Sequence, residues 1–193
     1  MDALLTDGNE RAALAAVRSL VRAGYEVGVA SARRFSLAGV SRTVRRLRLS
    51  TDPLSDPVGY AAEVGALARQ LAVRVLLPVT DASVEALLAS RLTLPFPDLV
   101  TYRVASDKVG MLDRARRAGL DVPETLVLEH ERVALPGATF FPAVLKPHRS
   151  IIRTAPGRGH LAVRFVDSAE ECRAALGDFS PAWFPVLLQR RRV

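Results

Sequence analysis

The sequence is poor in cysteine and lysine and has no long apolar run. Its single cysteine, Cys172, excludes a disulfide within the chain. No export signal follows Met1, and together with the lone cysteine this predicts a cytoplasmic protein. No stretch approaches the roughly 20 apolar residues of a membrane-spanning helix, so we expect no membrane association. With 193 residues, 49% of them hydrophobic, the chain can bury one full core or two small ones.

Motifs for metal and dinucleotide binding are absent as well. There is no H-x-x-H or C-x-x-C pattern and no cluster of carboxylates, so we expect no metal ligands within these residues. The first predicted turn contains Gly8 alone, which disfavours the G-x-G-x-x-G of an NAD-binding module. The histidines at 130, 148 and 160 are scattered, and only His148 is placed to approach a phosphate.

Positive charge is concentrated toward the C-terminus. Residues 1–100 carry 12 basic and 10 acidic side chains, whereas residues 101–193 carry 15 and 10. Nucleic acid, a membrane surface or nucleotide phosphates would each suit this excess. A nucleic-acid surface would use Arg45, Arg46, Arg48 and Arg190 to Arg192. No aromatic-rich basic ribbon accompanies these arginines, which disfavours a nucleic-acid partner.

The first hundred residues predict a parallel α/β domain. Short apolar strands at 3–6, 26–30 and 73–78 alternate with helical patterns at 10–23, 58–71 and 80–90, and we expect the strand at 73–78 inside the sheet. Gly24 should end the first helix. Residues 44–49 alternate apolar and basic side chains, as an edge strand does. The β-α-β order therefore predicts a compact Rossmann-like unit.

Polar residues follow the predicted strands of this unit. Ligands of open α/β sheets bind in the crevice at the carboxyl ends of the strands. The candidate substrate-binding residues there are Asp7, Asn9, Arg33 and Asp81. Asp7 and Asp81 could instead merely cap the helices that follow them, and both interpretations stay open.

The second part predicts a smaller α+β arrangement after a proline-rich boundary at 94–98. A helix capped by Ser106 should run to residue 118, with Gly119 as its stop. Strands are predicted at 124–128, 141–147, 161–166 and 186–189, and a helix at 167–176.

An anion-binding pattern stands at the centre of this second part. The apolar run at 143–145 ends on Lys146, and a loop rich in arginine and glycine follows. The backbone N–H groups of such a loop and a fixed ammonium can both face a polyphosphate. Only two of the 27 basic residues are lysine, Lys108 and Lys146, which marks both as candidates for a compact ammonium rather than a planar guanidinium.

Ordered motifs give the chain a family resemblance. Ser106-Asp107-Lys108 is followed by G-x-x-x-P from Gly119, by F-P-x-V-x-K-P at 141–147 and by a strand ending in Gln189. This order resembles the first half of an ATP-grasp domain of the carboxylate–amine ligase type. Residues 1–100 resemble the pre-ATP-grasp domain of the same enzymes. The resemblance thus implies a Rossmann-like pre-ATP-grasp domain at 1–100 and a partial α+β ATP-grasp domain at 101–193.

The resemblance also implies a chemistry. ATP phosphorylates a small-molecule carboxylate to an acyl phosphate, and an amine or similar nucleophile displaces the phosphate. The nucleotide-binding lysines would be Lys108 and Lys146, and Gln189 would lie on the strand that meets the adenine. The loop that covers the phosphates would contain Ser150, Gly157 and Gly159. No catalytic residue is implied within these residues.

Two departures from the family pattern matter. Arg190 follows Gln189 where the family usually has glutamate, and the chain stops at Val193, before the ribose-binding acid, the catalytic arginine and the Mg²⁺ ligands of the later half. We therefore expect weak ATP binding, no turnover by the isolated chain and a possible C-terminal companion polypeptide. The alternative is a non-catalytic, Rossmann-like nucleotide or sugar-nucleotide binding module that uses Asp7, Arg33 and Asp81.

Overall fold

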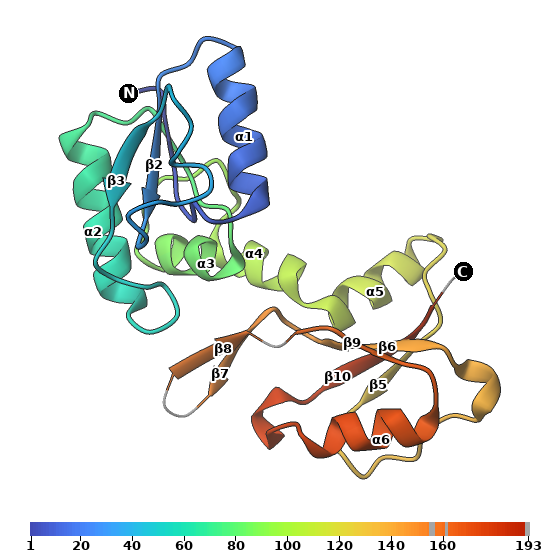
Figure 1. Cartoon of the computed structure of the whole chain (residues 1–193). Helices are drawn as coiled ribbons and strands as arrows, with labels where there is room; N and C mark the ends of the chain where they lie inside the picture. The colour runs from blue at the N-terminus through green and yellow to red at the C-terminus, as the bar shows by residue number, and fades with distance from the viewer. Residues whose placement is uncertain (155–156, 161, 192–193) are drawn as a thin grey trace. The chain divides into compact units, whose positions relative to one another are not determined.

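The computed structural model describes residues 1–154, 157–160 and 162–191 (Figure 1). The chain forms two compact units, Met1–Tyr102 and Arg103–Val193, each with its own sheet and core. Helix α4 (Leu99–Ser106) was not predicted, and the expected boundary after residue 100 falls inside it. Arg192 of the nucleic-acid hypothesis and Leu161 of a predicted strand lie outside the described residues.

The first unit contains a four-stranded parallel sheet. Its strands are β1 (Ala3–Leu5), β2 (Val27–Ser31), β3 (Arg45–Arg48) and β4 (Val75–Leu77), in the order β3-β2-β1-β4. The parallel sheet and the edge position of β3 are as predicted. The interior position expected for the strand at 73–78 is wrong, because β4 pairs only with β1 among the described strands and Val75 is 41% exposed.

Helices cover both faces of this sheet. Helix α1 (Arg11–Arg22) packs on one face through a cluster that includes Leu5, Val17 and Val29. Helices α2 (Pro57–Gln70) and α3 (Asp81–Ala89) supply Tyr60 and Leu87 to the cluster on the other face. Strands β1, β2 and β4 therefore contribute alternate side chains to two cores, whereas β3 contributes only Leu47.

The predicted glycine stops are confirmed by the helix ends. Gly24 has φ +86°, its N–H donates to the Val21 carbonyl over 3.0 Å, and Tyr25 N–H donates to the Leu20 carbonyl over 3.1 Å. Gly119 ends α5 (Lys108–Arg117) with the same pair of bonds and φ +76°. Only glycine adopts this left-handed conformation without a steric penalty, so the two helices end where the sequence places them.

The second unit is built on a four-stranded antiparallel sheet. Its strands are β5 (Thr125–Leu128), β6 (Ala143–Pro147), β9 (Arg164–Val166) and β10 (Val186–Arg190), in the order β5-β10-β6-β9. Short 3-10 turns occur at η1 (Ala138–Phe140) and η2 (Pro181–Trp183). The loop predicted after Lys146 instead forms a hairpin of β7 (Ile151–Thr154) and β8 (Gly157–His160), which pair antiparallel.

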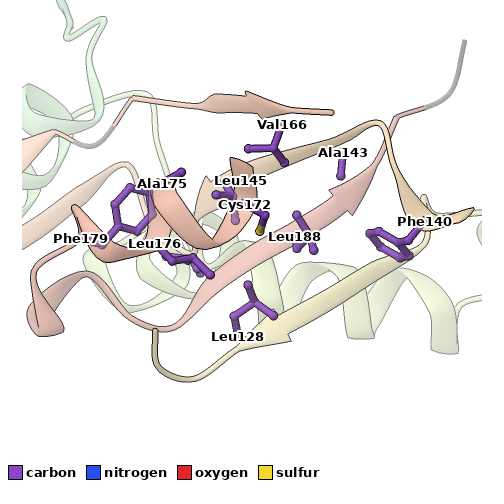
Figure 2. Packing of buried hydrophobic residues seen from close by; sticks show 11 residues of the cluster. Leu128, Phe140, Ala143, Leu145, Val166, Cys172, Ala175, Leu176, Phe179 and Leu188 are labelled. Atoms are coloured by element: carbon purple, nitrogen blue, oxygen red, sulfur yellow. The ribbon is translucent and has the colours of Figure 1, made fainter. Parts of the chain in front are cut away.

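One face of this sheet packs against α6 (Ala169–Gly177). Figure 2 shows Cys172 and Leu176 of the helix together with Leu145 and Leu188 of the two central strands, and all four side chains are buried. Since residues i and i+2 of a strand share a face, Val144, Lys146, Leu187 and Gln189 lie on the opposite face. The sheet therefore presents one apolar face to α6 and a second face that carries polar groups.

Candidate functional site

Lys146 lies on the polar face of the sheet, near the end of β6. Its half-buried ammonium donates a hydrogen bond to Oε1 of Gln189 over 2.5 Å. The register pairs Lys146 with Leu187, so Gln189 is its diagonal neighbour on β10. No carboxylate among the described residues pairs with this ammonium. Within the described ranges, a neutral amide orients this positive charge and no acidic side chain pairs with it.

The hydrogen-bond chain from Lys146 continues across a third strand. Gln189 is directly opposite Thr125 on β5, and its Nε2 donates to Thr125 Oγ1 over 3.0 Å. The Thr125 hydroxyl donates in turn to the Pro123 carbonyl over 2.8 Å. Both ends of the Gln189 amide are therefore used, which fixes its orientation and, through Oε1, the position of the lysine ammonium.

Helix α5 is hydrogen-bonded to the segment that follows β6. Lys108 N–H donates to the His148 carbonyl over 2.9 Å, and Lys108 Nζ lies 3.5 Å from Ser150 Oγ. The Asp107 carboxylate caps the helix by accepting from Val109 N–H at 3.1 Å and from the next N–H at 3.3 Å. The cap expected at Ser106 is wrong, because Ser106 belongs to α4.

Two further side chains, Arg149 and His148, lie at this strand end. Arg149 lies 3.5 Å from Asp107 Oδ2, which ties the segment after β6 to the α5 cap. His148 Nδ1 lies 2.9 Å from the Pro185 carbonyl, an acceptor, so Nδ1 carries the proton and Nε2 points elsewhere. Neither Asp107 nor Arg149 was among the candidate residues, because their separation of 42 residues conceals their contact.

The glycines proposed for a phosphate-covering loop lie in the hairpin. Gly159 is opposite Ile152, and Gly157 is opposite Thr154. Ser150 immediately precedes β7 and is the residue that Lys108 approaches. The hairpin therefore continues directly from the segment that follows Lys146 and that contacts Lys108.

Asp7 in the first unit is surrounded by donors from its own chain. Its Oδ2 accepts from Thr6 Oγ1 at 2.6 Å, Val79 N–H at 3.0 Å and Thr80 N–H at 3.1 Å. Its Oδ1 accepts from Ser83 Oγ at 2.7 Å and from the Thr80 hydroxyl at 3.2 Å. This carboxylate joins the end of β1 to the start of α3.

The other three candidate substrate residues lie in different surroundings. Asn9 Oδ1 accepts from Leu37 N–H at 3.3 Å, and Asp81, in the first turn of α3, accepts from the Tyr102 hydroxyl at 2.5 Å. Arg33 lines a hollow of about 330 Å³. Of the four, only Arg33 is among the residues that form this hollow.

Two groups whose pKa is raised by burial lie in the apolar cores. Burial raises the pKa of the Tyr60 hydroxyl, which bonds to Ser83 Oγ over 2.9 Å. Burial also raises the pKa of the Cys172 thiol to about 11, and this thiol lies in the core between α6 and the antiparallel sheet. A buried thiol of this kind is chemically inert at neutral pH.

The described residues, 1–154, 157–160 and 162–191, lack two kinds of feature. They contain no group of three or more histidine, cysteine or carboxylate side chains that could hold a metal ion. Within the same ranges, no helix is both long and apolar enough to cross a membrane.

The fold is that of the N-terminal part of ATP-grasp enzymes, which confirms the predicted fold class. No protein-family model and no curated protein matches the sequence. Among solved structures, the chain is similar to the L-amino acid ligase of Bacillus licheniformis, with 15% identity and a TM-score of 0.64. The match covers 98% of this chain and 44% of that one.

Two further solved structures share the fold. N5-carboxyaminoimidazole ribonucleotide synthetase from Thermotoga maritima has 15% identity and a TM-score of 0.61, over 99% of this chain and 46% of that one. The biotin carboxylase domain of Hydrogenobacter thermophilus 2-oxoglutarate carboxylase, in complex with MgADP, ADP and bicarbonate, has 16% identity and a TM-score of 0.60. That match covers 98% of this chain and 44% of the other, so the chain spans less than half the length of these enzymes.

Proposed function

We propose that this chain is the ATP-binding portion of an ATP-grasp ligase. The ligase would activate a carboxylate as an acyl phosphate for attack by an amine or similar nucleophile. One observation carries the proposal. The chain has only two lysines: Lys146 lies near the end of β6, and the backbone N–H of Lys108 donates to the carbonyl of His148, two residues beyond Lys146.

The chemistry requires positive charge at this place. A γ-phosphoryl group passes from ATP to a carboxylate oxygen, and the nucleophile then forms its bond to the carbonyl carbon as phosphate leaves. Both reactants of the first step are anions, so catalysis depends on neutralisation and positioning. Lys146 is oriented by Gln189 and Lys108 is fixed by α5, so both suit this task.

The remaining candidates are assigned to the same nucleotide. In this proposal Ser150 and the hairpin glycines, Gly157 and Gly159, approach the phosphates. Gln189 belongs to the strand that meets the adenine. The contact between Lys108 and Ser150 and the bond between Lys146 and Gln189 support placing all of them at one ligand.

Magnesium does not fit the described residues, which offer no cluster of carboxylates for it. We propose that its ligands come from outside these 193 residues, in a continuation of the same polypeptide or in a companion polypeptide. The 193 residues alone should then bind ATP weakly and should not turn it over. Sustained ATP hydrolysis by the purified chain with Mg²⁺ contradicts this part of the proposal.

The test is calorimetric titration of the chain with ATP. We expect Lys146→Ala and Lys108→Ala each to weaken binding about tenfold, the effect of one lost charge-assisted contact. Arg116→Ala is the matched control, since Arg116 is an exposed cation on the same helix as Lys108. An equal loss in all three variants indicates non-specific attraction and refutes the proposed site.

The same titration distinguishes the alternative function. A non-catalytic nucleotide or sugar-nucleotide binding module would use the first unit, where Arg33 lines the hollow. Undiminished nucleotide binding by the double variant of Lys108 and Lys146 favours that module over the ligase.

A further inference from the structure

The hollow in the first unit is unusually basic. It lies where β2 and β3 end, and it is lined by Val29, Arg33, Arg34, Phe35, Ser36, Arg46, Leu47 and Arg48. Four of these eight residues are arginines and none is acidic. Its volume of about 330 Å³ is at the lower end of the range for small-molecule sites.

Strand register explains why two of the arginines share one face of the sheet. Arg46 is paired with Val29, a residue of the core under α1, and Arg48 follows two positions later on the same face. Arg45 is exposed and alternates to the other face, and it does not line the hollow. The strand therefore supplies both a site arginine and a matched arginine outside the site.

The arginines of the hollow are not paired with carboxylates among the described residues. Among the described residues, none of its four arginines forms an ion pair; the guanidinium of Arg34 instead lies 5.3 Å from the ring centre of Phe35. Four like charges around one concavity repel one another and raise its potential for anions. A guanidinium offers paired N–H donors that fit phosphate and carboxylate oxygens.

The loop that carries Arg33 and Arg34 is fixed to the rest of the unit. Ala38 N–H donates to the Gly8 carbonyl over 2.7 Å, and Asn9 Oδ1 accepts from the neighbouring N–H at Leu37. A Cβ added at Gly8 would lie 2.6 Å from Ser36 Oγ, so only glycine allows this close approach. The anchoring makes the hollow a preformed site, which lowers the entropic cost of binding.

From these observations we propose that the hollow binds a small oxyanion with two or more negative charges, either a phosphate monoester or a tricarboxylate. The charge of the lining calls for a multivalent anion, and the volume suits a small molecule rather than a polymer. Only contacts within the first unit carry the proposal. It therefore goes beyond the proposed ATP site and does not depend on it.

The experiment is calorimetric titration of the full chain at low ionic strength with ribose 5-phosphate, citrate and neutral ribose. We expect one of the two anions to bind at a single site and ribose not to bind. The anion that binds identifies the ligand class. Absence of binding by both anions overturns the proposal.

Variants on one strand locate the site. Arg46→Gln should weaken anion binding about tenfold, as the loss of one charge-assisted contact predicts, while Arg45→Gln should change it less than twofold. Equal losses indicate a diffuse charge effect and overturn the proposal. If Arg46→Gln fails to fold, as judged by circular dichroism, Arg34→Gln on the exposed loop takes its place with the same expected loss.

Titration with a single-stranded oligonucleotide distinguishes a small-molecule site from a nucleic-acid surface. A nucleic-acid surface would bind the oligonucleotide more tightly than the small anions, and this binding would fall steeply with salt. It would also weaken equally in Arg45→Gln and Arg46→Gln. That combined result overturns the small-molecule site. Weak binding that ribose 5-phosphate or citrate displaces supports it.

Discussion

The ammonium of Lys146 and Oε1 of Gln189 lie 2.5 Å apart, diagonally across β6 and β10. The acceptor is a neutral amide held by its own bond to Thr125. This arrangement positions the lysine without cancelling its charge. A carboxylate in the place of Gln189 would position it as well, but would also neutralise it.

Gln189→Glu should therefore weaken ATP binding about tenfold or more, because the new carboxylate pairs with Lys146 and repels the triphosphate. Gln189→Met is the control, since it removes the acceptor without adding charge, and its loss should be smaller. Calorimetric titration with ATP measures both. Equal affinities of wild type and Gln189→Glu would show that this lysine does not meet the nucleotide.

Asp7 yields a prediction on stability rather than on binding. Asp7→Ala leaves the buried hydroxyls of Thr6 and Ser83 without their acceptor, which should lower the free energy of unfolding by about 3 kcal/mol. Asp7→Asn should cost less, because asparagine keeps an acceptor and tolerates the φ of 57°. Urea unfolding followed by circular dichroism measures the change, since the only tryptophan, Trp183, lies in the other unit.

If Asp7→Ala unfolds at the same urea concentration as wild type, Asp7 does not stabilise the fold and is again a candidate ligand-binding residue. In that case nucleotide or sugar-nucleotide binding should fall in the variant. With a structural role, the surviving folded protein should bind as wild type does.

Local patterns predicted most of the secondary structure. The helical spacing of Leu14, Val17 and Val21, followed by Gly24, depends only on neighbouring residues, and α1 ends as expected. The shift of the α5 cap from Ser106 to Asp107 was not predictable, because both residue types cap well and the extent of α4 decides between them.

Contacts between distant residues explain what the sequence did not predict. Lys108 was a candidate, but nothing in the spacing showed that its helix is bonded to the segment after Lys146. The basic hollow is lined by residues 46–48 of β3 and by residues 33–36, which follow β2, the strand that pairs in parallel with β3. From the sequence, Arg46 and Arg48 were expected on an edge strand and Arg33 in a crevice, and nothing in their spacing predicted one common site.

The carboxylate of Glu63 should make the free energy of unfolding depend on pH in the acid range. Burial alone would raise its pKa, but hydrogen bonds from the side chains and backbone of Thr51 and Ser50 outweigh burial and hold the pKa below its ordinary value of 4.5. A depressed folded-state pKa stabilises the protein above the unfolded-state value, and this contribution is lost as pH falls through the folded-state value.

Glu63→Gln should therefore unfold at lower urea than wild type at pH 7, and the difference should shrink as the pH falls below about 4. Urea titrations at pH 7, 5 and 3 followed by circular dichroism test this sign. A difference that grows toward acid pH would mean that the hydrogen bonds from Ser50 and Thr51 do not favour the charged carboxylate.

The only cysteine of the chain gives a direct probe of the second unit. Cys172 is fully buried between α6 and the sheet, and burial raises its pKa to about 11 (Figure 2). At pH 8 the folded protein should resist iodoacetamide, whereas the protein in urea should react at the rate of an ordinary thiol. Rapid labelling of the native protein would contradict the buried position of this side chain.

Labelling can also report on nucleotide binding, because a ligand that binds only the folded state lowers the population of opened molecules. At a urea concentration that allows slow labelling, ATP should therefore protect Cys172 in wild type. Lys146→Ala should lose this protection, while Arg116→Ala should keep it, since only Lys146 lies on the strand that bonds to Gln189. Protection that survives in Lys146→Ala would place the nucleotide away from the end of β6.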